Sequence, residues 1–143
     1  STNLPLYIAT NEGVYQMIII APYQNSKDIQ TNLNPNNTTY TNAFTFSLIG
    51  YLESGVSVGT YFLDSAFKFY NATSGGITEA FLSTYTKAKF SIFIQRITRL
   101  TDGGATHLGS ARWNDTTTSW TSLGTLTTSA ANGTIIVLVR RLV

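Results

Sequence analysis

The sequence predicts an all-β domain, an antiparallel β-barrel or sandwich with jelly-roll-like or Greek-key connections. Short apolar segments rich in Val, Ile, Phe and Tyr recur along the chain, and turn signals separate them about every ten residues. Little helix is expected. These observations predict about eight or nine short strands around one layered core. At 143 residues the chain is expected to form a single domain, residues 1–143.

The N-terminal third is predicted to contain an arm, one strand and a long loop. Pro5 blocks a helix and residues 11–13 make a turn, so the first dozen residues are expected to form an arm. Residues 14–20, VYQMIII, are short and β-branched, which favours a buried strand. Residues 23–42 are polar, and the sequence NPNN at 34–37 is a strong turn signal, so a loop is expected there.

The middle of the chain is predicted to form a meander. Residues 44–52, 56–63 and 66–70 each alternate apolar and polar side chains and are separated by turn residues. Residues 77–85 follow a loop and are compatible with one helical turn, because their Thr and Tyr residues disfavour a longer helix.

Residues 89–100 give the clearest strand pattern. One face of this strand is apolar: Phe90, Ile92 and Ile94. The other face mixes polar and apolar side chains: Ser91, Phe93, Gln95 and Ile97. An amphipathic helix is the alternative, but the β-branched content and the neighbouring strands favour a strand.

The C-terminal third is predicted to contain three strands. Residues 102–104, DGG, are a hairpin signal. Residues 105–114 and 118–126 are then expected to be strands joined by a turn. Residues 134–143, TIIVLVRRLV, are expected to close the chain as a buried strand, with Arg140 and Arg141 as an interface pair or a solvated strand end.

Composition excludes several classes of function. The nine Lys and Arg residues are scattered, whereas nucleic-acid binding needs a concentrated basic face. No apolar run reaches 18 residues, so no membrane insertion is expected, and no signal peptide is recognisable. Cysteine is absent, which excludes disulfides and thiolate metal sites. The chain begins at Ser1 without Met, so we expect it to be excised from a longer protein.

The sequence gives little support for an enzymatic function. One histidine and no G-x-S-x-G elbow argue against a nucleophilic triad, and no P-loop or dinucleotide fingerprint implies a cofactor. A glycosidase needs two carboxyl groups about 5–9.5 Å apart. Asp102 and Asp115 bracket one predicted strand and should lie at opposite ends of it. No catalytic residue, metal or cofactor is therefore expected.

One stretch, residues 102–120, concentrates the side chains that bind saccharides. An indole ring stacks on the CH face of a sugar, while charged and imidazole groups reach its hydroxyls. The candidate saccharide-binding residues are His107, Arg112, Trp113, Asp115 and Trp120. Alternation places His107 and Trp113 on one strand face and Arg112 on the other. The alternative is that both tryptophans belong to the core and that His107 is an ordinary hydrogen-bonded residue.

The chain resembles the head domain of lactococcal phage receptor-binding proteins. The resemblance rests on a cysteine-free, Thr- and Asn-rich all-β chain, a late Trp/His/Arg/Asp cluster and the apolar last segment. It implies a homotrimer of β-barrel heads at the phage tail tip or baseplate, outside the cell, that binds cell-wall saccharide of a Gram-positive host. By residue type, the implied contacts are His107, Trp113 or Trp120, Asp102 or Asp115, and Arg112 or Arg140.

Three functional hypotheses follow. The first is a non-enzymatic receptor-binding head that recognises host cell-surface saccharide. The second is a structural, oligomerising domain of a virion or adhesin, whose tryptophans are core residues. The third is a glycan-cleaving depolymerase. An observation that favours self-association is that eight tyrosines and eight phenylalanines would saturate one small core.

Overall fold

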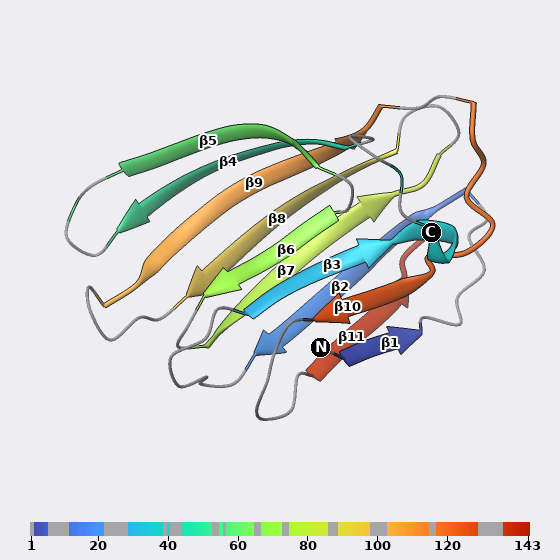
Figure 1. Ribbon diagram of the computed structural model, residues 1–143. Helices are drawn as coiled ribbons and strands as arrows, with labels where there is room; N and C mark the ends of the chain where they lie inside the picture. The colour runs from blue at the N-terminus through green and yellow to red at the C-terminus, as the bar shows by residue number, and fades with distance from the viewer. Residues whose placement is uncertain are drawn as a thin grey trace.

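The computed structural model describes residues 2–5, 12–21, 29–38, 40, 44–52, 55, 57–64, 67–72, 75–85, 89–97, 103–114, 117–128 and 136–143. These residues form an antiparallel β-sandwich of two open sheets (Figure 1). The all-β prediction is confirmed, and of the two architectures expected the sandwich is the one observed. The described residues contain eleven strands, more than the sequence predicted, because the segments expected to be an arm, a loop and a helical turn each contribute a strand.

The smaller sheet has four strands in the order β1-β10-β3-β6. Its strands are β1 (Thr2–Pro5), β10 (Thr125–Thr128), β3 (Ile29–Asn34) and β6 (Phe67–Ala72). Two predictions are corrected here. The expected N-terminal arm pairs with β10 as a strand, and the expected long loop contains β3. Backbone pairing between distant segments stabilises strands whose own sequences are polar.

The larger sheet has seven strands in the order β11-β2-β7-β8-β9-β4-β5. Its strands are β11 (Ile136–Arg141), β2 (Val14–Ala21), β7 (Gly76–Ser83), β8 (Phe90–Ile97), β9 (Ala105–Trp113), β4 (Phe44–Leu52) and β5 (Ser57–Asp64). The helical turn expected at 77–85 is wrong, because β7 is hydrogen-bonded to β2 and β8 on both sides.

The C-terminal strand differs from the buried strand that was expected. β11 pairs with β2 alone and is an edge of the large sheet. Ile136 and Leu138 are exposed, while Val137 and Val139 pack partly against the core. The apolar run is therefore half-buried, with alternate side chains on opposite faces of an edge strand.

The core lies between the two sheets. In Figure 1 the small sheet lies over β8, β7, β2 and β11, whereas β9, β4 and β5 extend past its β6 edge. We call the face of the large sheet that meets the small sheet the inner face and the opposite one the outer face. Side chains of β2 and β7 fill the inner face: Tyr15, Met17, Ile19, Ala80 and Leu82. No described strand covers the outer face.

A segment without regular structure covers one end of the inner face. Residues 117–124 carry Trp120 and Leu123 into the core. Of the strand expected at 118–126, only residues 125 and 126 belong to a strand, β10. The short 3-10 helix η1 (Pro35–Asn37) holds this segment. The Asn36 side-chain oxygen accepts hydrogen bonds from the backbone N–H groups of Thr121 (2.7 Å) and Ser122 (3.2 Å). These N–H groups are thus satisfied by a side chain instead of a neighbouring strand.

Asn36 itself adopts the left-handed conformation, with φ of 57°. Asparagine tolerates this region better than most residues, which explains why the NPNN turn signal falls here. Within the described residues, no helix is long and apolar enough to cross a bilayer.

Candidate functional site

The two tryptophans of the predicted site lie in the core. Trp113 ends β9 and is 2% exposed, and Trp120 is 5% exposed. Their rings meet edge to face, with centroids 5.4 Å apart, and the rings of Tyr40 and Phe44 each lie 4.9 Å from Trp113. Aromatic neighbours thus surround the indole of Trp113. In this chain the tryptophans are core residues, the alternative that the sequence left open, and their buried faces do not stack on a ligand.

His107 also points to the inner face. Its Nδ1 lies 2.9 Å from the side-chain nitrogen of Gln95, and the hydroxyl of Thr78 donates to the other end of that amide over 3.3 Å. An amide nitrogen only donates, so Nδ1 accepts and the imidazole holds its proton on Nε2. The ring lies over Gly50, where an added Cβ would overlap it. These contacts give His107 a structural role between β8 and β4.

Arg112 is the member of the predicted cluster that the structure shows exposed. The prediction that His107 and Trp113 share one strand face and Arg112 the other is confirmed by the register of β9. Asp115 and Asp102 lie outside the described residues. The structure therefore divides the predicted site: His107, Trp113 and Trp120 face inward, and Arg112 faces outward.

Around Arg112 the outer face carries a group of hydrogen-bonding side chains, which we call the polar corner. Its members come from β4, β9 and the residue that follows β9: Thr45, Ser47, Ser110, Arg112 and Asn114. Arg112 donates from Nε to the side-chain oxygen of Asn114 over 3.1 Å. The amide nitrogen of Asn114 donates to the hydroxyl of Thr45 over 2.8 Å. Arg112 and Thr45 are register partners, so this network ties β9 to β4.

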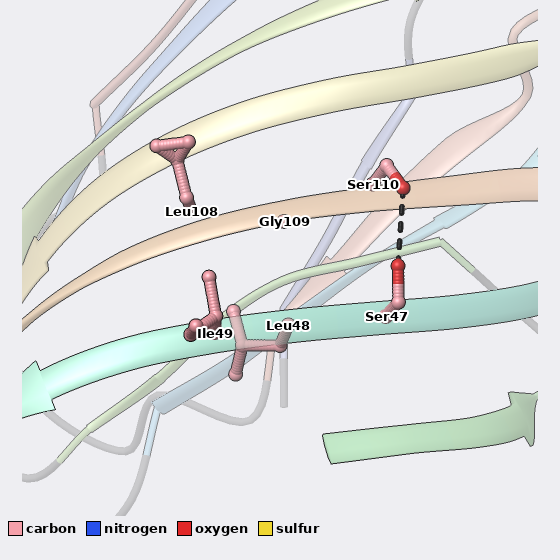
Figure 2. Close-up of a pocket in the computed structure, with 6 residues that line it drawn as sticks. All are labelled: Ser47, Leu48, Ile49, Leu108, Gly109 and Ser110. Atoms are coloured by element: carbon pink, nitrogen blue, oxygen red, sulfur yellow. Dashed lines mark hydrogen bonds between the residues drawn. The ribbon is translucent and has the colours of Figure 1, made fainter. Parts of the chain in front are cut away.

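A shallow depression adjoins the polar corner between β4 and β9 (Figure 2). The hydroxyls of Ser47 and Ser110 lie 3.2 Å apart at one end, and Leu108 and Ile49 stand at the other. Gly109 contributes only backbone between the two ends. The depression thus combines an apolar wall with a pair of hydroxyls.

Phe90 places an aromatic ring beside these polar groups. It is 46% exposed and is the register partner of Arg112 on the neighbouring strand. Side chains at directly paired positions have Cβ atoms about 5 Å apart on the same face. The side chains of Phe90 and Arg112 therefore start from neighbouring positions on the outer face.

The polar corner contains hydrogen-bonding groups of several kinds. It offers a guanidinium, an amide and three hydroxyls, with no carboxylate or imidazole among its described members. In the described part of the chain, no cluster of three His, Asp or Glu residues could hold a metal ion.

Large hydrophobic side chains occupy much of the rest of the outer face. Of the twelve large hydrophobic residues that the structure shows exposed, nine lie there by register, and we call these nine the apolar band. They are Ile49, Tyr51, Ile77, Phe90, Ile92, Ile94, Leu108, Ile136 and Leu138. Exposed apolar patches of this extent mark interaction surfaces.

The sequence interpretation missed Phe90, Thr45 and the serines as surface residues. A signal existed for Phe90, because residues 89–100 alternate and Phe90 shares its face with Ile92 and Ile94. No comparable signal existed for the serines and Thr45, since they become neighbours of Arg112 only through the pairing of β4 with β9. Searches against family models, curated proteins and solved structures found no match for this chain.

Proposed function

We propose that this chain is a non-enzymatic adhesion domain that recognises saccharide through the polar corner and Phe90. The observation that carries the proposal is an exposed aromatic ring paired across strands with an arginine inside a hydrogen-bonded network. A sugar ring presents CH groups on its faces and hydroxyls around its rim. Phe90 offers the stacking surface, and Arg112 with its neighbours offers the donors and acceptors.

Geometry supports this assignment in two further ways. The bond from Arg112 to Asn114 orients the guanidinium before any ligand arrives, which reduces the entropy lost on binding. The Ser47 and Ser110 hydroxyls both donate and accept, as sugar hydroxyls do. The depression between β4 and β9 is open, a form that suits one residue of a surface polymer.

The biological setting of the proposal comes from the resemblance to lactococcal phage receptor-binding heads. On that basis the domain belongs to the tail tip or baseplate of a virion, works outside the cell as an oligomer and binds cell-wall saccharide of its host. Its charged residues amount to only 11% of the chain, so its polarity comes mainly from hydroxyls and amides, as a saccharide-binding surface requires.

A second function, a structural oligomerising domain of a virion or adhesin, is favoured by the burial of both tryptophans. In that case the outer face serves assembly alone and the polar corner is only its rim. The two functions differ in one measurable property, the affinity of the folded protein for host cell-wall fragments.

Isothermal titration with cell-wall saccharide fragments tests the proposal. Phe90→Ala and Arg112→Ala should each weaken binding about tenfold or more, the equivalent of losing roughly 1.4 kcal/mol of contact. The matched control is Tyr51→Ala, which removes another exposed ring from the outer face, at the far end of β4 from Thr45. If wild-type protein binds no fragment, or if all three variants bind equally well, saccharide recognition at the polar corner is wrong.

A further inference from the structure

The apolar band extends across the outer face of the large sheet from β11 to β4. One row of register partners contains Leu138, Ile18, Glu79, Ile94, Leu108 and Ile49, one from each of six adjacent strands. All members of this row except Glu79 are large and aliphatic. In the neighbouring row, Ile136, Ile20 and Ile77 are partners in the same way. The residue composition of these rows is closer to that of a sheet face inside a sandwich than to that of a face exposed to water.

We infer that the apolar band is the surface on which a second copy of this chain packs, sheet against sheet. Adjacent strands lie about 4.8 Å apart, so the seven strands span about 29 Å, and strands of this length extend for about 20 to 30 Å. The whole outer face, with the polar corner included, therefore measures roughly 750 Å², close to the ~800 Å² that each partner contributes to a standard interface.

The described residues of the outer face carry charges of both signs. Glu79 lies in β7, beside the central strand β8, and Gln16 donates to its carboxylate over 2.9 Å. Three arginines share this face: Arg96 on the central strand β8, Arg112 on β9 and Arg140 on the edge strand β11. Because one face carries both signs, a copy related by a two-fold axis can set an arginine against Glu79. An apolar lipid surface offers no counter-charge for this carboxylate.

A network on β11 and β2 gives the band a polar margin. Arg140 donates from Nε to the side-chain oxygen of Gln16 over 2.7 Å, and Gln16 in turn donates to Glu79. The polar corner forms the margin on the other side, over β9 and β4. An apolar centre with a polar rim is the usual anatomy of a protein interface. The polar corner lies at the rim of the band and shares Phe90 with it. The inference rests on the band alone, whether or not the corner binds saccharide.

The solution mass tests the inference. By sedimentation equilibrium the wild-type protein should have a mass that is a multiple of 15.6 kDa. The double variant Ile94→Lys with Leu138→Lys places two charges in the band and should shift the mass to the monomer. Both residues are about half exposed, so the variant should keep the wild-type circular dichroism spectrum. Ser119→Lys, an exposed site on the segment that covers the inner face, should leave the wild-type mass unchanged.

A second measurement does not depend on a disruptive variant. The chain has no cysteine, so Thr106→Cys introduces a unique site for a nitroxide label on the outer face. Labels at this position should show dipolar coupling between copies, which dilution with unlabelled protein removes. The label at Ser119→Cys should show markedly weaker coupling.

Three outcomes would overturn the inference. The first is a wild-type protein that remains monomeric at every concentration. The second is a lysine double variant that keeps the wild-type mass, because another surface then joins the copies. The third is a monomer that co-sediments with phosphatidylglycerol vesicles, which would assign the band to a lipid surface.

Discussion

Hydrophobicity alone does not explain which of the two faces of the seven-stranded sheet packs into the core. The inner face is packed into the core yet carries a polar row, Thr78, Gln95 and His107, across three adjacent strands. The outer face carries an almost unbroken aliphatic row, yet no described strand covers it. The comparison shows that the more apolar face of a strand is not always the face that packs within its own chain.

Shape and hydrogen bonding explain why the mixed face packs well inside. The polar row satisfies itself, since Thr78 donates to Gln95 and Gln95 donates to His107. Rings cover the glycines of the neighbouring strands: Phe93 lies over Gly109 and His107 over Gly50. A buried polar group costs little when its hydrogen bonds are made, and dense packing supplies the rest.

The largest expected effect comes from removing an indole from the inner side. Trp113→Ala and Trp120→Ala should each lower the free energy of unfolding by about 3–5 kcal/mol, because each leaves a large cavity in the aromatic cluster. Urea unfolding followed by circular dichroism measures this. Tyr51→Ala, an exposed ring on the outer face, should change stability far less. A tryptophan variant that keeps wild-type stability would show that the cluster is not part of the core.

A smaller effect is expected where a ring covers a glycine. Gly109→Ala would place a methyl group against the ring of Phe93, and Gly50→Ala would place one against His107. Each change should destabilise the protein by about 1–3 kcal/mol, the usual cost of overpacking. Gly59→Ala is the matched control on β5, since its nearest neighbouring atom would lie 4.0 Å away. Equal midpoints of urea unfolding for Gly109→Ala and Gly59→Ala would contradict the packing described here.

The smallest effect should follow a change on the outer face. Ile94→Thr removes an aliphatic side chain that is 54% exposed, so the monomer should lose no more than about 0.5 kcal/mol of stability. The measurement is urea unfolding at low protein concentration. At high concentration the difference from wild type should grow, because association stabilises only the protein that retains its apolar band. A loss that is large and independent of concentration would place Ile94 inside the monomer core.

Fold class and much of the strand pattern could be predicted from the sequence. Residues 44–52 were expected as a strand and are β4 with the same bounds, and the alternation of residues 89–100 matches β8. Segments with weak local signals were missed, notably β1 and β3, because their partners lie far away in the chain. For the candidate site, alternation correctly separated Arg112 from His107 and Trp113, but it did not indicate which group faced solvent.

That limit has a physical cause. The alternation of side chains along a strand assigns them to two faces, but the alternation is the same whichever of the two faces is covered. Sequence by itself therefore established that Phe90, Ile92 and Ile94 share one side of a strand and that Phe93 lies on the other. The sheet order and the packing of the smaller sheet decided that Phe93 lies inside. The same packing buried the tryptophans and left Arg112, Phe90 and the apolar band on the outer face, since burial depends on contacts between segments distant in the chain.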